Sequence, residues 1–188
     1  MKVNAYIDGF NLYHSILSLN NNSLKNVNLR KLCQYYLLKN DVLNDVYYFS
    51  ALPYHLEGAN QGKVARHKNY IKALKEVNVK TILGKFKSKT QKCKNCLANY
   101  ISYEEKQSDI NIAITMLSDA YENKFDKAVL LTADTDFVST IIKIKEKFPQ
   151  KQILLLVPPN RNKIASELRK YANKHFQINA KILQTCLF

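Results

Sequence analysis

Short apolar runs alternate with longer amphipathic stretches along this chain of 188 residues. Apolar runs bounded by turn residues predict strands over 3–7, 45–52, 79–83, 127–132 and 152–157. Apolar positions that recur every three or four residues predict helices over 11–19, 62–77, 110–121, 137–147 and 164–172, with a further helix after Asn28 as its N-cap. Strands that alternate with helices are typical of an α/β fold with a parallel sheet. No repeat or linker interrupts the pattern, so we expect one domain over 1–188.

The segment 85–103 breaks this alternation because it is polar and rich in lysine. It contains Cys93 and Cys96 in a CxxC motif, which is half of a tetrahedral zinc site. Cys33 and Cys186 lie far away in the sequence. We expect an insertion outside the sheet, formed as a hairpin or as a small metal knuckle. Structural zinc, a plain reduced turn and a contact shared between subunits all remain open.

Composition excludes several classes of protein. Hydrophobic residues make up 46% of the chain, and only four glycines and four prolines occur, so disordered and fibrous classes do not fit. No apolar run approaches the roughly 20 residues that span a bilayer, and residues 1–8 are typical of a strand rather than a signal peptide. We therefore expect a cytoplasmic protein without membrane association and without a disulfide framework.

The chain is strongly basic, with 29 Lys and Arg against 15 Asp and Glu and a pI near 9.6. Such a balance favours a nucleic-acid partner, although a lysine-rich proteome alone would also produce it. The candidate contacts lie in the predicted helix over 62–77 and in the insertion: Lys63, Arg66, His67, Lys68, Lys72, Lys85, Lys87, Lys89, Lys92 and Lys94. Tyr100 and Tyr103 are candidates for stacking on the bases of a single strand. An ordinary solvated face is the alternative for each of these residues.

Acidic residues gather in three short stretches of this basic chain: Asp8, then Glu104, Glu105 and Asp109, then Asp134 and Asp136. Asp8 and Asp134 follow predicted strands, whose carboxyl ends form the ligand-binding edge of a parallel sheet. Asp136 is predicted at the start of the next helix, and Glu105 and Asp109 are predicted on one face of a helix start. Converging carboxylates repel one another unless a cation binds. Oxygen ligands without His or Cys favour Mg²⁺ or Mn²⁺, which can activate water and neutralise a scissile phosphate.

Each acidic stretch also has an ordinary structural explanation. Asp8 and Asp134 can cap the helices that follow them, and Glu104 and Glu105 can favour a helix dipole without a metal. Haloacid-dehalogenase-like phosphatases carry an Asp-x-Asp motif after the first strand, whereas here that motif comes late. The four histidines form no HxxH or HExxH pattern, which disfavours a zinc hydrolase. The remaining classes are a metal-dependent nuclease, a nucleic-acid-binding scaffold that cuts nothing, and a phosphatase or nucleotidase.

Three motifs resemble the NYN domain of the PIN-like nuclease superfamily, and the LabA-like bacterial proteins most of all. They are Asp8-Gly-Phe-Asn11, Glu105-Lys106-x-x-Asp109 before an apolar helix, and Thr132-Ala-Asp134-Thr-Asp136. The resemblance implies a Rossmann-like, three-layer α/β sandwich around a mainly parallel sheet. It also implies an endoribonuclease that hydrolyses RNA with Mg²⁺ or Mn²⁺.

The resemblance further assigns roles to single residues. It implies that Asp8, Asp109, Asp134 and Asp136 bind the metal, with Asn11 as the polar residue beside the first strand. Glu105 and Lys106 match the Glu-Lys pair before the third acid, and Glu105 is a further candidate ligand. Thr132 keeps a hydroxyl group where many relatives have Ser. Gln107-Ser108 stands where Gly-Val is more usual, which changes the local backbone freedom but removes no ligand.

Overall fold

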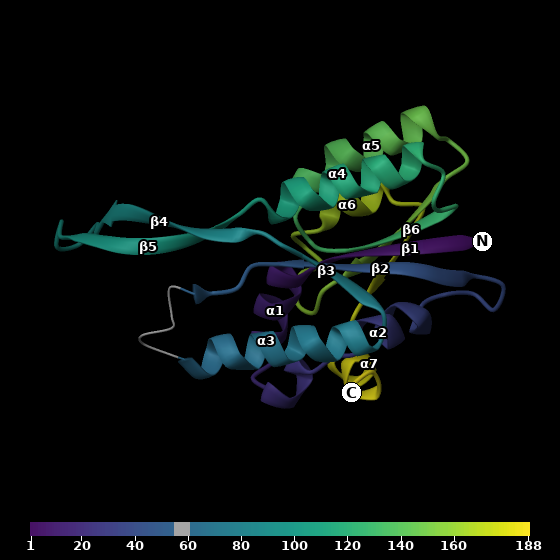
Figure 1. Ribbon diagram of the computed structural model, residues 1–188. Helices are drawn as coiled ribbons and strands as arrows, with labels where there is room; N and C mark the ends of the chain where they lie inside the picture. Colours follow the sequence, from purple (N-terminus) through teal and green to yellow (C-terminus); the bar gives the residue numbers. More distant parts are fainter. Residues whose placement is uncertain (55–60) are drawn as a thin grey trace.

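Six parallel strands form the centre of the structure, a computed structural model that describes residues 1–54 and 61–188 (Figure 1). The strands are β1 (Lys2–Asp8), β2 (Val42–Ser50), β3 (Val79–Leu83), β6 (Lys127–Leu131), β7 (Gln152–Val157) and β8 (Lys174–Gln177). Their order across the sheet is β3-β2-β1-β6-β7-β8, and all neighbouring strands run parallel. This is the predicted Rossmann-like α/β architecture.

The strand order reverses between β1 and β6. From β1 the chain adds β2 and β3 on one side, and it later returns to place β6 on the other side. The two strands pair from Val3 with Lys127 to Ile7 with Leu131. Ligands in such sheets bind outside the carboxyl ends of the strands at the point where the order reverses. Asp8 ends β1 and Asp134 follows β6 closely, so the topology places both acids at this point.

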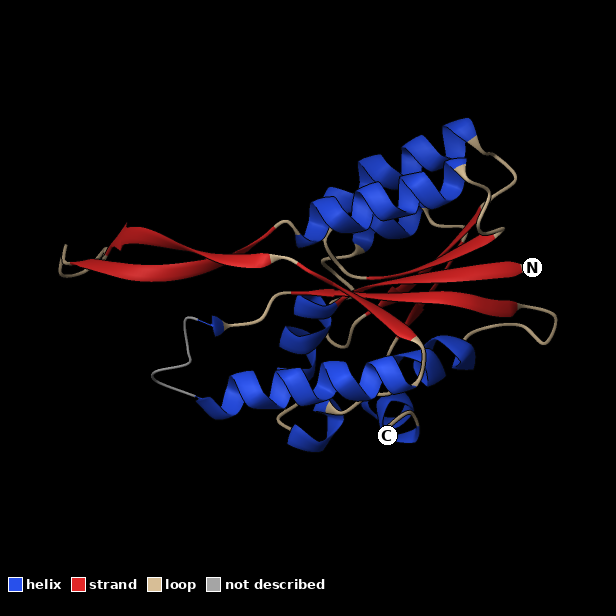
Figure 2. Ribbon diagram, in the orientation of Figure 1, coloured by secondary structure: helices blue, strands red, loops and turns tan. Residues whose placement is uncertain are grey.

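Helices cover both faces of the sheet (Figure 2). One face carries α1 (Gly9–Leu17), the 3₁₀ helix η1 (Asn22–Lys25), α2 (Leu29–Tyr35), α3 (Gln61–Glu76) and α7 (Ala180–Thr185). The other face carries α4 (Ser108–Tyr121), the 3₁₀ helix η3 (Thr135–Phe137), α5 (Val138–Lys147) and α6 (Ser166–Tyr171). Side chains of β1 alternate between the two cores, with Val3 and Ile7 in one and Tyr6 in the other.

The insertion is an antiparallel hairpin that projects from the body of the protein (Figure 1). It consists of β4 (Lys85–Lys92) and β5 (Asn99–Lys106), and it is longer than the predicted 85–103 because Lys106 still pairs with Lys85. Glu104 and Glu105 are therefore strand residues, and the prediction that Glu105 shares a helix face with Asp109 is wrong. A Cβ atom at Gly84 would lie 2.5 Å from the Lys106 carbonyl oxygen, so glycine allows the two segments to approach closely at the root of the hairpin.

Two other elements differ from the sequence pattern. The short strand β8 was not predicted, because only Phe176 among its four residues is even partly buried. Helix α4 was predicted, but the periodic apolar residues that predicted it do not all face the core. Ile110 and Ile114 are 63% and 58% exposed, whereas Ile112 and Met116 are fully buried.

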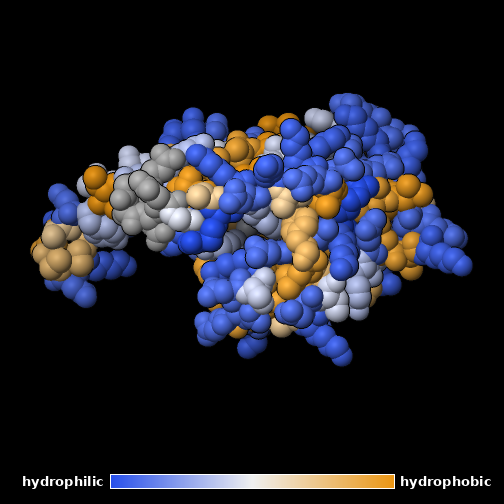
Figure 3. Space-filling model, turned by 60° about the horizontal axis from the view of Figure 1, so that its bottom comes forward, coloured by the Kyte–Doolittle hydropathy of each residue, from blue (hydrophilic) through white to orange (hydrophobic). Residues whose placement is uncertain are grey.

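The face shown in Figure 3 is mostly hydrophilic, with apolar residues in small separate groups. Within residues 1–54 and 61–188, no helix is long and apolar enough to cross a membrane.

Candidate active site

Asp8 is fixed by hydrogen bonds to both of its carboxylate oxygens. Oδ1 accepts from the backbone N–H of Asn11 at 2.9 Å, and Oδ2 accepts from the Thr132 hydroxyl at 2.8 Å. The first bond caps α1, so the capping role anticipated from the sequence is real. The residue after Asp8 must be small, because a Cβ atom on Gly9 would lie 2.4 Å from the Tyr48 ring. The end of β1 therefore places a buried, rigid carboxylate at the point where the strand order of the sheet reverses.

The second acidic stretch is linked to Asp8 through the Thr132 hydroxyl. Thr132 Oγ1 also accepts from the backbone N–H of Asp134 at 3.1 Å. Asp134 Oδ1 accepts in turn from the backbone N–H of Asp136 at 3.0 Å, which caps η3. One buried hydroxyl group thus holds the carboxyl ends of β1 and β6 in a single hydrogen-bonded arrangement.

The third acidic stretch lies at the root of the hairpin, where β5 leads into α4. The Ser108 hydroxyl donates a hydrogen bond to Oε1 of Glu105, while Oε2 of Glu105 is buried without a partner. Asp109 lies in the first turn of α4. Between them Gln107 has φ 81°, a left-handed conformation that reverses the chain from strand to helix. This turn brings Glu105 and Asp109 to the same edge although they belong to different elements.

The acids interact electrostatically across the three stretches. Burial raises the pKa of Asp8 to about 6, and the charges of Asp109 and Asp134 act in the same direction. Burial likewise raises the pKa of Glu105 to about 7, with added repulsion from Asp8 and Asp109. Partial burial raises the pKa of Asp109, and so do the carboxylates of Asp134 and Asp136. The structure therefore places the five acids close enough together for their charges to interact.

These five acids have no basic partner among the described residues. Within residues 1–54 and 61–188, none of them forms an ion pair, although the chain carries 29 Lys and Arg. The adjacent Glu104 shows the opposite situation. It pairs with Lys89 at 2.8 Å and Lys106 at 2.9 Å, and these hydrogen-bonded lysines lower its pKa to about 2. Lysine side chains therefore lie near the site, but within the described residues they pair with Glu104 and not with the five acids.

The residues present suit a hard divalent cation. In the described part of the chain, no group of three or more His, Cys, Asp or Glu side chains is already placed to hold a metal ion. Two buried oxygens nevertheless lack partners, Asn11 Oδ1 and Glu105 Oε2, and such atoms are costly unless something satisfies them. Mg²⁺ usually binds one or two carboxylates directly and keeps several waters, so it needs no closed protein cage. An open group of carboxylate and amide oxygens fits Mg²⁺ or Mn²⁺ better than zinc.

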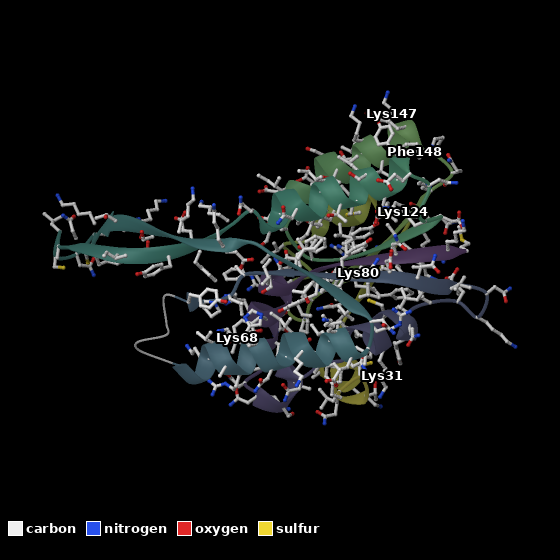
Figure 4. All side chains as sticks on the ribbon, in the orientation of Figure 1. Lys31, Lys68, Lys80, Lys124, Lys147 and Phe148 are labelled. Atoms are coloured by element: carbon white, nitrogen blue, oxygen red, sulfur yellow. The ribbon has the colours of Figure 1, made fainter. Side chains whose placement is uncertain are left out.

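Other predicted site residues lie outside this group. Lys106 pairs with Glu104 on the hairpin, and none of its ion pairs in the described residues is to the five acids. Lys89 has the same partner. Lys68, labelled in Figure 4, places its ammonium nitrogen 4.9 Å from the centre of the Tyr54 ring. Lys63, Arg66 and Lys72 are exposed on α3 and Lys87 is exposed on β4, whereas His67 is partly buried beside the Tyr48 and Ser50 hydroxyls. Cys93 and Cys96 lie at the tip of the hairpin.

An aromatic and basic surface that the sequence pattern did not predict lies on and around α1, and its first ring, Phe10, is two residues after Asp8. We call it the α1 surface and define it as Phe10, Tyr13, His14, Lys25 and Arg161. Phe10 and Tyr13 are 44% and 41% exposed, and their ring centres lie 4.2 and 5.5 Å from that of His14. Lys25 Nζ lies 5.8 Å from the Tyr13 ring centre. Burial and the nearby charge of Arg161 lower the pKa of His14. The i, i+3, i+4 spacing of these rings was the available signal.

The loop after β7 is fastened to α1, which explains why Arg161 lies there. The Ser15 hydroxyl donates to the Pro159 carbonyl, and the Asn160 amide donates to the Ser18 hydroxyl at 3.2 Å. A cavity of about 220 Å³ lies separately at the root of the hairpin. Its described lining includes the rings of Tyr54, Phe86 and Tyr103, together with Lys85, and none of the five acids.

Comparisons with known proteins agree with this architecture. A crystal structure of a protein of unknown function from Vibrio parahaemolyticus is similar in fold, with a TM-score of 0.64 at 14% identity, over 95% of this chain and 93% of that one. No curated protein matches the sequence. The family profile of the NYN domain matches residues 2–179, which include all five acids. The chain therefore belongs to the NYN domain family, within the PIN-like nuclease superfamily.

Proposed function

We propose that this protein is a ribonuclease that uses Mg²⁺ or Mn²⁺ to hydrolyse phosphodiester bonds within RNA. Membership of a nuclease superfamily supports the reaction class. The observation that carries the proposal is the group of five mutually repelling carboxylates without a basic partner in the described chain, in a protein with a net charge of +14. A bound divalent cation would orient and activate water and neutralise charge on the scissile phosphate.

The hydrogen bonds suggest how the chain prepares this site. Asp8, Asp109, Asp134 and Asp136 would hold the cation. Asp8 has the least freedom, because both of its oxygens accept hydrogen bonds. Thr132 is a positioning residue, since its hydroxyl orients Asp8 and the backbone of Asp134 together.

Two further residues would complete the polar lining of the site. Asn11 Oδ1 is free to accept a hydrogen bond from a water or from a ribose hydroxyl. Glu105 Oε2 remains free to accept from a water or to bind the cation directly.

The α1 surface would bind the RNA strand beside the acids. Exposed rings stack on unpaired bases at about 1–3 kcal/mol per base, and nearby cations attract the phosphates. Phe10 and Tyr13 supply the rings, and Lys25 and Arg161 supply the charge. Exposed Lys63, Arg66 and Lys72 on α3 would add longer-range attraction. The substrate would then be a single-stranded region of RNA, which the protein would meet in the cytoplasm.

The proposal is tested by cleavage of labelled single-stranded RNA, structured RNA and DNA, with Mn²⁺, Mg²⁺ or EDTA. We expect cutting of single-stranded RNA by the wild-type protein with metal, none with EDTA, and none by Asp134→Asn, which should still bind RNA. Asp45→Asn is the matched control, because Asp45 pairs with Lys80 at 2.7 Å away from the site.

Two results would contradict the proposal. RNA binding without cutting under every condition would favour the non-catalytic scaffold. Hydrolysis confined to small phosphate esters would favour a phosphatase or nucleotidase.

A further inference from the structure

The tip of the hairpin holds two cysteines in an ordered turn. Residues 93–98 connect β4 and β5, and the turn is closed by two backbone hydrogen bonds. The N–H of Cys93 donates to the Ala98 carbonyl at 2.8 Å, and the N–H of Leu97 donates to the Cys93 carbonyl at 2.9 Å. Both thiols are free.

The turn directs backbone amides at one sulfur atom. The N–H groups of Cys96 and Asn95 donate to the Cys93 sulfur, and the Cys96 side chain contacts it as well. Successive amides aimed at one atom stabilise an anion, and the thiolate is the form of cysteine that binds metals. The two sulfurs of a CxxC motif in this arrangement are a preformed pair of ligands.

Backbone strain at the next residue supports a specific role for this turn. Leu97 has φ 59°, in the left-handed region. A side chain in that region costs on the order of 1–2 kcal/mol, and the hairpin turn holds Leu97 in this conformation. Leu97 is also 63% exposed, so core packing does not explain its conformation.

One chain cannot complete a zinc site here with its described residues. Structural zinc takes four ligands, and no third His, Cys, Asp or Glu in residues 1–54 and 61–188 joins the pair. Cys33 and Cys186 are buried in the body of the protein. Figure 1 shows the hairpin pointing away from both layers of helices. A zinc ion bound by this pair would take its other ligands from outside these residues, and the tip of a second copy would bring two equivalent thiolates.

Charge and apolar exposure at the tip fit such a pairing. Zn²⁺ with four thiolates carries a net charge of −2. Lys92 and Lys94 flank Cys93 in each copy, so four lysines would surround that anion. Ile101 is 65% exposed and, like Leu97, would be covered by the partner hairpin. Without the metal, the same lysines would keep two tips apart.

We propose that Cys93 and Cys96 of two copies of this chain bind one Zn²⁺ and join the hairpins at their tips. The site is independent of the ribonuclease proposal, because it shares no residue with the five acids. It would make dimerisation depend on zinc and hold the two nuclease sites at a fixed separation.

The test measures zinc and molecular mass together. Protein purified under reducing conditions is analysed by elemental mass spectrometry and by light scattering after size exclusion. We expect one zinc per two chains, a dimer, and dissociation to monomers with a strong chelator. Cobalt substitution should give the visible bands of a tetrahedral thiolate site.

Matched variants separate this proposal from misfolding and from the nuclease proposal. Cys93→Ser and Cys96→Ser should lose zinc and become monomers while circular dichroism stays unchanged. Asn95→Ser keeps both thiols and the backbone amide, and it should retain zinc and the dimer. Asp134→Asn should also retain both, whatever its cleavage activity.

Three results would overturn the shared site. They are one zinc per chain in a monomer, a Cys93–Cys96 disulfide in zinc-free protein from reducing conditions, and a dimer that persists in Cys93→Ser with chelator.

Discussion

In the described chain, buried carboxylates have polar and basic partners at the amino edge of the central sheet and lack basic partners at its carboxyl edge. At the amino edge, Asp41 pairs with Lys127 and lies 3.7 Å from the N-terminal amine. Asp119 accepts hydrogen bonds from Tyr6 at 2.7 Å and Asn4 at 3.2 Å, and Lys124 lies 3.3 Å away. These acids are satisfied by the protein itself, as buried charges in a stable fold must be.

At the carboxyl edge Asp8 is buried and Glu105 is partly buried, their carboxylates repel each other, and neither has a basic partner in residues 1–54 and 61–188. Both edges belong to one sheet of the same lysine-rich chain. A shortage of basic residues therefore does not explain why only the amino edge has basic partners for its acids. A fold retains such a group when something outside the chain neutralises it, and a divalent cation is the ligand that suits the oxygens present.

Cleavage should distinguish the two edges most strongly. Asp109→Asn at the carboxyl edge should lower the rate of RNA cleavage by about 100-fold or more, since it removes a proposed ligand. Asp41→Asn should leave the rate per folded molecule unchanged. The rates are compared in single-turnover assays at a temperature where both variants are folded. Equal losses in the two variants would refute the distinction.

The free energy of unfolding should instead be more sensitive to substitution at the amino edge than at the carboxyl edge. Asp41→Asn leaves Lys127 buried without its partner and should lower the free energy of unfolding by about 3 kcal/mol. Urea denaturation measures the change. A cost below about 0.5 kcal/mol, typical of an exposed ion pair, would show that the amino edge is not held by this contact.

Removal of the metal should make stability depend on pH through Asp8. The folded pKa of about 6 lies above the ordinary 3.8, so the folded protein holds this proton more tightly than the unfolded chain does. In EDTA the free energy of unfolding should therefore fall as pH rises from about 4 to about 6. Asp8→Asn lacks this loss and should be roughly 2 kcal/mol more stable than wild type at pH 8. Mn²⁺ should stabilise only the wild type.

Urea denaturation at pH 5 and pH 8 provides the measurement for Asp8. A wild-type protein that is equally stable at both pH values in EDTA would contradict the raised pKa.

RNA binding should depend on the α1 surface. Phe10→Ala should weaken binding of single-stranded RNA by about 10-fold, the value of one lost base stack. The matched control is Tyr35→Ala, which removes a ring that is 58% exposed on α2. Fluorescence anisotropy in EDTA measures binding without cutting. If Phe10→Ala bound single-stranded RNA as tightly as wild type, the RNA would not pass over the α1 surface.

The smallest effect concerns the turn that brings the hairpin acids to the site. Gln107 has φ 81°, so Gln107→Gly should relieve strain and stabilise the protein by about 1 kcal/mol. Gln107→Ala keeps the unfavourable conformation and should change stability little. Thermal unfolding measures both, and equal melting temperatures for the two variants would contradict the strain.

The sequence predicted the sheet well, because buried parallel strands such as β7 (Gln152–Val157) consist almost wholly of a continuous apolar run. It placed Asp8 and Asp134 at the carboxyl edge of the sheet for the same reason, since each follows such a run. It misplaced Glu105, because strand pairing with the lysine-rich β4 leaves no apolar period to mark the extent of β5. The hydrogen bonds of Thr132 and the place of Arg161 beside α1 depend on tertiary packing, which local periodicity does not encode.

Titration of the protein with Mn²⁺, followed by electron paramagnetic resonance, tests the central claim most directly. We predict that wild type and Asp41→Asn bind Mn²⁺ and that Asp134→Asn binds it at least about 10-fold more weakly. Wild-type protein that binds no Mn²⁺ with or without RNA, or Asp134→Asn that binds it as tightly as wild type, would contradict a metal centre at the carboxyl edge.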